Sequence, residues 1–162
     1  MIKKEVEKIL QYVQKPARYV GGELNSVIKD ANKVDIRYAF CFPDIYEIGM
    51  SHLGMKILYG LVNEREDAWC ERVFAPDVDM EEQMRKHNVP LFALESGDYI
   101  KDFDMIGFTL MYELCYTNVL NMLDLAGIPL FSKDRTELAP IICVGGPCAC
   151  NPEPIADFVD IV

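Results

Sequence analysis

The segment 43–52 contains side chains whose types and spacing could serve a ligand. Asp44 is followed two residues later by Tyr46, and Gly49 stands three residues after the tyrosine. A carboxylate can orient a neighbouring group by accepting a hydrogen bond from it. The phenol of Tyr46, with an ordinary pKa of about 10, is mostly protonated at neutral pH and is therefore a poor metal ligand. A Pro-Asp turn that caps the following helix explains the same residues equally well.

A second set of candidates stands at the ends of two later apolar segments, 104–110 and 141–144. Thr109 provides a small hydroxyl near the end of the first segment, and Gly145 and Gly146 follow the second. Paired glycines let a backbone approach a ligand closely, because no side chain intervenes. A buried strand whose threonine bonds to nearby backbone, followed later by a tight glycine turn, is the alternative explanation.

The cysteines and one histidine are weaker candidates for metal binding. Cys143, Cys148 and Cys150 form the pattern C-x4-C-x-C, which has the spacing of neither a zinc ribbon nor a cluster-binding motif. We therefore predict no metal site and interpret them as buried or loop thiols. His52 lies six residues after Tyr46, within or at the start of an expected helix, so we do not predict it to be a ligand.

Strands and helices that could position these residues alternate along the chain. Apolar runs bounded by turn residues predict strands at 34–42, 69–74, 90–94, 104–110 and 141–144. Helical spacing and capping residues predict helices at 51–63, 79–88 and 112–126. The first of these helices is expected to have one apolar face, formed by Leu53, Ile57, Leu58, Leu61 and Val62.

This alternation predicts a doubly wound α/β fold of the flavodoxin or Rossmann type. The sheet should be mostly parallel, with about five strands and helices on both faces. Such sheets bind ligands at the carboxyl ends of their strands. The expected ligand loops are 43–50, 75–78, 95–98, 109–113 and 145–151.

The chain divides into an arm and a body. Residues 1–33 comprise an amphipathic helix over 2–13 and an irregular segment with Pro and Gly, and residues 34–162 form the α/β domain. Residues 157–162 resemble a strand that is entered and then cut off, which predicts that the chain is a fragment of a longer protein.

Composition excludes several classes of protein. The 162 residues are 51% hydrophobic and 26% charged, which argues against disorder and low complexity. No apolar run reaches the roughly 18 residues of a membrane span, and no signal peptide is evident. The formal charge of −10 disfavours nucleic-acid binding by the body. Six cysteines in mostly apolar segments predict free thiols and a reducing, cytoplasmic location.

Together these features carry a family resemblance. From about residue 15 to residue 162 the chain resembles the N-terminal part of bacterial radical SAM proteins that carry a cobalamin-binding-like domain ahead of the radical SAM barrel. The resemblance runs through KPARYVGGELNSV, FPDIYEIGMSHLGMKILY, RVFAPDVDME, PLFALES, GFTLMYELCYTNVLNMLDLAGIPL and GGPCACNPEPIADFVD.

The resemblance implies a role for each candidate residue. In cobalamin-binding domains a D-x-H-x-x-G loop ligates cobalt from below, and Tyr46 stands here in the histidine position. Asp44, Tyr46 and Gly49 would lie beneath the corrin. Along the nucleotide tail would lie Thr109, in a variant of the Ser-x-Leu motif, with Gly145 and Gly146. The resemblance thus implies that any bound cobalamin lacks a protein imidazole ligand.

The resemblance also implies a module that is not catalytic by itself. Its partner would be the radical SAM barrel of the same full-length chain. A C-x-x-x-C-x-x-C motif there would hold the [4Fe–4S] cluster that cleaves S-adenosylmethionine, and this chain has no such motif.

Two alternatives compete with a cobalamin module. A degenerate scaffold or interaction domain would keep the fold for docking against the barrel and a substrate protein or RNA. The absent histidine and the altered Ser-x-Leu motif favour this reading. A flavodoxin-like FMN site is disfavoured, because the loop that begins at Pro43 is not a Ser/Thr/Gly-rich phosphate loop.

Overall fold

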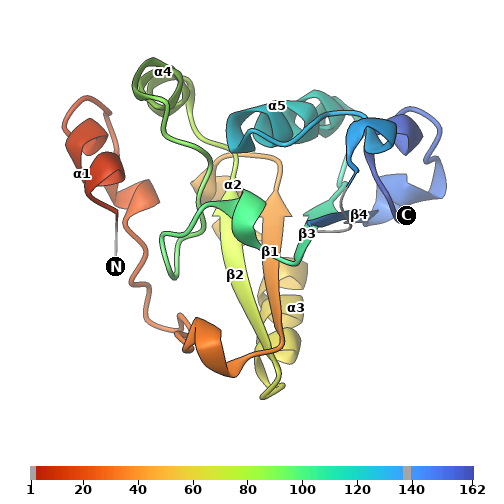
Figure 1. Ribbon diagram of the computed structural model, residues 1–162, viewed down its shortest axis with the longest axis horizontal. Coiled ribbons are helices and arrows are strands. Elements are labelled where there is room, and N and C mark those ends of the chain that lie inside the picture. Colours follow the sequence, from red (N-terminus) through yellow and green to blue (C-terminus); the bar gives the residue numbers. More distant parts are fainter. Residues whose placement is uncertain (1–2, 137–139) are drawn as a thin grey trace.

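The computed structural model describes residues 3–136 and 140–162 and has a mixed α/β architecture (Figure 1). Its centre is a parallel sheet with the strand order β2-β1-β3-β4. The strands are β1 (Ile36–Phe42), β2 (Ala68–Phe74), β3 (Met105–Thr109) and β4 (Ile141–Gly145). The predicted α/β fold with a parallel sheet is confirmed, but the described residues form a sheet of four strands instead of about five.

The expected strand at 90–94 is the wrong prediction. The N–H of Leu91 donates to the carbonyl of Leu125 at the end of α5 (Tyr116–Ala126), and the N–H of Leu94 donates to the Arg72 carbonyl of β2 at 2.9 Å, without forming a strand of the sheet. Phe92 forms an isolated antiparallel bridge with Tyr99. The apolar side chains of this segment are buried all the same. The apolar run therefore indicated burial correctly, but a buried loop gives the same pattern as a buried strand.

The end of the described chain runs beside β4. Ile161 forms one parallel bridge with Cys143, and the Val144 N–H donates to the Ile161 carbonyl at 3.0 Å. The strand predicted for 157–162 is thus limited to a single bridge, and the first two residues of that segment belong to η7 (Ala156–Phe158) instead.

The remaining helices are α1 (Lys4–Leu10), α2 (Tyr46–Ser51), α3 (Leu53–Asn63) and α4 (Val78–His87). The helix expected at 51–63 is in fact preceded by α2. His52 separates the two helices in an extended conformation and caps α3, where its Nδ1 accepts a hydrogen bond from the Met55 N–H at 3.1 Å. Short 3-10 turns complete the chain at Pro16–Tyr19, Ala31–Lys33, Ile100–Asp102, Glu113–Cys115, Ser132–Asp134 and Pro147–Cys150. Within the described residues, no helix has the length and apolar character needed to cross a membrane.

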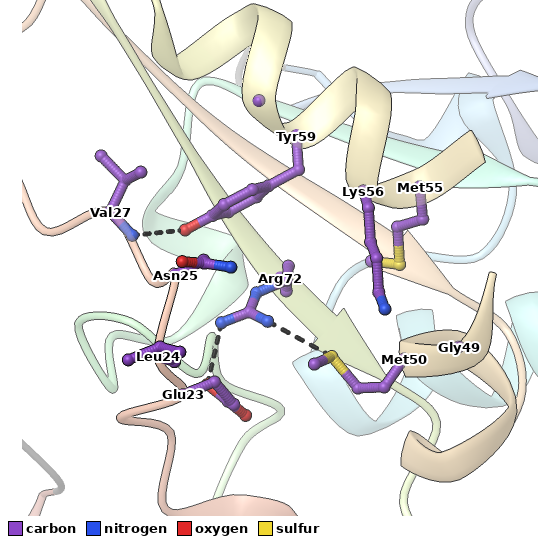
Figure 2. Close-up of a pocket in the computed structure, with 11 residues that line it drawn as sticks. Glu23, Leu24, Asn25, Val27, Gly49, Met50, Met55, Lys56, Tyr59 and Arg72 are labelled. Atoms are coloured by element: carbon purple, nitrogen blue, oxygen red, sulfur yellow. Dashed lines mark hydrogen bonds and ion pairs between the residues drawn. The ribbon is translucent and has the colours of Figure 1, made fainter. Parts of the chain in front are cut away.

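One face of the sheet is packed by α2 and α3. Met55 and Tyr59 point from α3 toward β2 and form a small core with Phe40, Phe42, Cys70 and Phe74 (Figure 2). The apolar face predicted for this helix is not the buried one, since Leu53, Ile57 and Leu61 are 68%, 52% and 54% exposed. Apolar residues occur all around α3, so their spacing alone could not select the side that packs.

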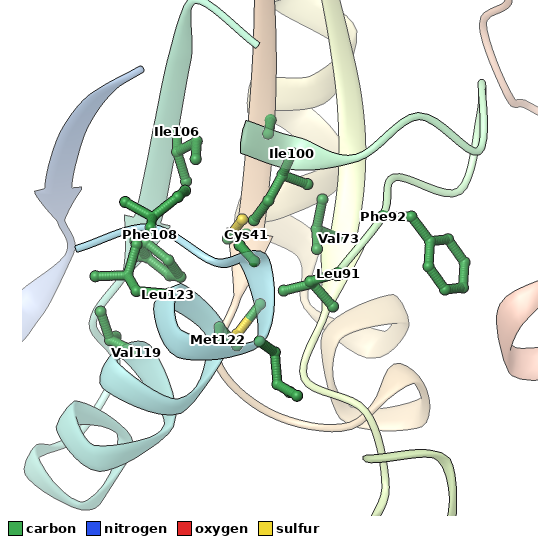
Figure 3. Packing of buried hydrophobic residues seen from close by; sticks show 14 of the residues in the cluster. Cys41, Val73, Leu91, Phe92, Ile100, Ile106, Phe108, Val119, Met122 and Leu123 are labelled. Atoms are coloured by element: carbon green, nitrogen blue, oxygen red, sulfur yellow. The ribbon is translucent and has the colours of Figure 1, made fainter. Parts of the chain in front are cut away.

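The opposite face is covered by α1, α4 and α5, whose side chains form the larger core. Ile106 and Phe108 of β3 pack with Met122 and Leu123 of α5 and with Val73 of β2 (Figure 3). All five side chains are 2% exposed or less. At roughly 1.5–3 kcal/mol for each large buried side chain, this core is the main source of stability.

The N-terminal arm is integrated into the same body. Val6 and Ile9 of α1 are buried in the larger core, and α1 packs against α4. The rest of the arm then runs past the sheet to the start of β1 (Figure 1). An isolated helix of seven residues is unstable in water, so α1 depends on this packing.

Candidate ligand site at the strand ends

Asp44 lies directly after β1 and connects two loops. Its Oδ2 accepts a short hydrogen bond from the hydroxyl of Tyr112, which follows β3. The Asn118 amide of α5 also donates to the Pro43 carbonyl at 2.9 Å, so the β1 loop is joined both to the β3 loop and to α5. The hydrogen bond to Asp44 raises the pKa of Tyr112 to about 12. The Asp44 carboxylate is therefore engaged with protein groups.

Tyr46 begins α2 and faces away from Asp44. Its hydroxyl donates to Oε1 of Glu23 in the arm at 2.9 Å, and its ring meets the ring of Phe74 edge-on, with centroids 5.4 Å apart. Burial, together with the hydrogen bond to Glu23, raises the pKa of Tyr46 to about 12. The phenol thus stays protonated at neutral pH and cannot act as a phenolate ligand.

Gly49 of α2 serves the packing of that helix. It is buried, and a Cβ at this position would collide with the ring of Phe74 and crowd the ring of Phe42. The glycine therefore allows α2 to lie directly on the aromatic residues at the ends of β1 and β2. In the sequence, a single glycine within an apolar helix was compatible with this packing role. The spacing of Gly49 from Asp44 and Tyr46 was also compatible with a ligand role.

Thr109, Gly145 and Gly146 gather at the ends of β3 and β4. Thr109 and Gly145 are register partners in the sheet. Gly146 has a φ of +101°, and a Cβ there would lie 3.2 Å from the Thr109 hydroxyl oxygen and 2.8 Å from the Leu110 carbonyl oxygen. The Cys148 N–H donates to that same carbonyl at 3.1 Å. The backbones of the loops after β3 and β4 therefore contact each other at the place that the resemblance assigns to the nucleotide tail.

The arm crosses the strand ends of β1 and β2. Arg18 is 8% exposed and pairs with Glu47 of α2 at 2.9 Å and, more closely, with Asp77, the N-cap of α4. The Arg18 guanidinium lowers the pKa of Glu47 to about 2. Two of the loops predicted to hold a ligand are thus tied to the arm.

A buried charge network lies beneath this crossing and was missed by the sequence reasoning. Arg72 donates through Nε to Glu95 at 2.6 Å and through Nη2 to Glu23 at 2.8 Å. Burial raises the pKa of Glu95 despite the nearby guanidinium. The signal was present in the sequence of β2, AWCERVF, where Glu71 and Arg72 interrupt an apolar strand that is buried throughout.

Cys143, Cys148 and Cys150 lie outside this network. Cys143 is half-buried in β4, and Cys148 and Cys150 lie in the turn that follows it, all with free thiols. Among residues 3–136 and 140–162, no group of three or more His, Cys, Asp or Glu side chains is placed to hold a metal ion.

Comparison with known proteins places the chain in a family. Residues 54–162 match the sequence model of the N-terminal region of radical SAM proteins, which is more than half of the chain. The chain therefore belongs to the family of radical SAM N-terminal domains. An uncharacterized protein of Methanocaldococcus jannaschii is 29% identical over 126 residues, which cover 76% of this chain and 22% of the relative. No solved structure matches this chain.

Proposed function

We propose that this chain is a non-catalytic docking module of a radical SAM protein and that it does not hold cobalamin by a lower ligand. The single observation that carries the proposal is the separation of Asp44 from Tyr46. In the family pattern these positions act together on cobalt, whereas here one binds Tyr112 and the other binds Glu23. We place the [4Fe–4S] cluster and S-adenosylmethionine in the radical SAM domain of the parent protein.

The residues present do not fit a cobalt ligand set. A good cobalt ligand at the Tyr46 position would be a phenolate, and the raised pKa of Tyr46 favours the protonated phenol, which is a poor metal ligand. The hydroxyl is also directed to the arm, which is fastened at the same helix through Arg18 and Glu47. These contacts favour a scaffold or interaction domain over a cobalamin-binding domain in which only the histidine has been replaced.

Visible spectroscopy with hydroxocobalamin tests this proposal. We expect no spectral change with the purified protein and none with Tyr46→His, because the side chain at this position packs on Phe74 and is directed to Glu23 of the arm. Tyr12→His, at a 60% exposed position, is the matched control for adventitious coordination by a new imidazole. A histidine-ligated spectrum with Tyr46→His and not with Tyr12→His would show that the lower-ligand site is intact.

A second candidate is cobalamin bound without any protein ligand. The gathering of Thr109, Gly145 and Gly146 at neighbouring strand ends favours it, because these are the positions that the resemblance assigns to the nucleotide tail. Corrinoid that co-purifies with the parent protein and shows the spectrum of the free cofactor would support this candidate. Its loss in Gly145→Val, where an added Cβ meets no protein atom within 4 Å, would locate it between the β3 and β4 loops.

The partner that we propose is the radical SAM domain of the parent protein, docked on the outer side of α3. Leu53, Ile57 and Leu61 form an exposed apolar surface there. The neighbouring sheet residues Met105 and Cys143 are only half-buried, although parallel sheets are ordinarily covered on both faces. The chain covers 22% of its relative, so most of that protein lies outside the matched region.

A further inference from the structure

A cavity of about 410 Å³ lies between the arm, α2, α3 and β2 (Figure 2). Its walls are mostly apolar and include Val27 of the arm, Met50 of α2, and Met55 and Tyr59 of α3. Leu24 stands at the rim and is almost fully exposed. The volume falls within the range of about 300–1,000 Å³ that is typical of small-molecule sites.

The cavity has fixed walls. The Val27 N–H donates to the Tyr59 hydroxyl at 2.7 Å, and the Trp69 indole N–H donates to the Val27 carbonyl at 2.9 Å. The Arg72 guanidinium lies 4.9 Å from the centre of the Tyr59 ring and donates to the Met50 sulfur at 3.2 Å. These contacts fix the positions of the arm and α2 relative to α3 and β2. The cavity is therefore present without a ligand.

The two charged groups Glu23 and Lys56 beside the cavity differ in their hydrogen-bond partners. The Glu23 carboxylate accepts hydrogen bonds from Tyr46, Ser26 and Arg72. Lys56, in contrast, is an exposed residue of α3 whose side chain extends along the cavity (Figure 2), and within residues 3–136 and 140–162 its ammonium group has neither an ion pair nor a hydrogen bond. The positive charge of Lys56 is therefore the charge that a ligand could neutralise.

We propose that this cavity binds a small amphiphilic anion. An apolar or aromatic body would lie between Met50, Met55 and Tyr59, and a carboxylate, sulfonate or phosphate group would pair with Lys56. The cavity shares Gly49 with the strand-end candidates and Glu23 with the hydrogen bond of Tyr46, but the proposal does not depend on the docking function or on cobalamin. Its chemistry follows from an apolar enclosure with one unpaired cation at its edge.

Binding of decanoate and of the neutral 1-decanol tests the anionic head group. Each would be measured by displacement of the fluorescent probe 8-anilinonaphthalene-1-sulfonate. We expect decanoate to bind more tightly by about two- to fivefold, as for a partly exposed ion pair. Lys56→Gln should abolish that preference. Lys33→Gln, which removes an exposed charge elsewhere, is the matched control and should keep it.

Filling the cavity tests its location. A Cβ at Gly60 meets no atom within 4 Å, so Gly60→Leu can project into the space without strain on the backbone. We expect at least a tenfold loss of probe affinity, whereas Gly60→Ala should bind normally. Unfolding of both variants in urea would show that the fold is kept, because each replaces a helical glycine with a better helix former.

Any of the following outcomes would overturn the proposal. Equal binding of decanoate and decanol, or a preference that survives in Lys56→Gln, would remove the role of the cation. Normal probe binding in Gly60→Leu would exclude the cavity. Binding that is lost in Ile57→Glu but kept in Gly60→Leu would place the probe on the exposed side of α3.

Discussion

On one face of the sheet, α1, α4 and α5 bury a continuous apolar core, whereas α2 and α3 pack the other face mainly over β1 and β2. The second face carries the cavity, the charged network around Arg72 and the exposed side of α3. The candidate strand-end residues divide in a related way, since Tyr46 and Gly49 belong to α2 and Thr109 and Gly145 to the other half of the sheet. The difference places the larger apolar core on one face of the sheet, and the cavity and the buried ion pairs of Arg72 on the other.

The largest loss of stability is expected at Phe108, which is 2% exposed within the larger core. Phe108→Ala should lower the free energy of unfolding by about 3–5 kcal/mol, through lost burial and the cavity left behind. Urea unfolding followed by circular dichroism measures this loss. A change below about 1 kcal/mol would mean that the face covered by α1, α4 and α5 does not dominate stability.

Removal of Arg72 should have the next largest effect. Arg72→Met leaves Glu95 buried without its partner, and we expect a loss of about 3 kcal/mol in the free energy of unfolding. Glu95 can relieve part of the penalty by taking up a proton, so the double variant with Glu95→Gln should be more stable than Arg72→Met. Arg65→Met, which breaks an exposed pair with Asp67, is the control and should cost less than about 1 kcal/mol. Equal losses from Arg72→Met and Arg65→Met would contradict a special role for burial.

The arm contact at Glu47 should depend on pH. The pKa of Glu47 is lowered from 4.5 to about 2 by its hydrogen bond with Arg18, so the folded protein favours the ionised carboxylate. Its stabilising contribution is therefore complete above the ordinary pKa of 4.5 and is lost as the pH falls toward 2. The difference in Tm between the protein and Glu47→Gln should shrink over that interval. A difference that stays constant from neutral pH down to about 2, the lowered pKa of Glu47, would refute this contact.

Substitutions on the exposed side of α3 should have the smallest effect on the stability of this chain. They test directly whether this side of α3 contacts another domain. Ile57→Glu combined with Leu61→Glu should change the free energy of unfolding of this chain by less than about 0.5 kcal/mol, because both side chains are exposed. In the parent protein the same pair should make the junction with the radical SAM domain more sensitive to limited proteolysis. Gln11→Glu with Gln14→Glu adds the same charge at exposed positions and should leave the junction protected. Unchanged proteolysis in the Ile57 and Leu61 variant would remove α3 as the docking surface.

Local sequence patterns determined the elements of the sheet and the loops at its carboxyl edge. Apolar runs bounded by turn residues located β1, β2, β3 and β4, because a strand covered on both faces needs apolar side chains in succession. The alternation with helices then required a parallel sheet, which brings Thr109 and Gly145 together at its edge. The paired charges within β2 were also visible in the sequence, although not their partners.

Only the tertiary structure decided which groups those side chains contact. The choice of Met55 and Tyr59 as the packed side of α3 depended on the fit of side chains against β2, because the helix is apolar on several sides. Arg72 and Glu23 are 49 residues apart in the chain, and no local pattern relates them. The spacing of Asp44 and Tyr46 suggested a shared ligand, but their orientations were set by partners from the β3 loop and from the arm. Spacing along a chain fixes how far apart two side chains can be, whereas their direction depends on the packing of segments that are distant in sequence.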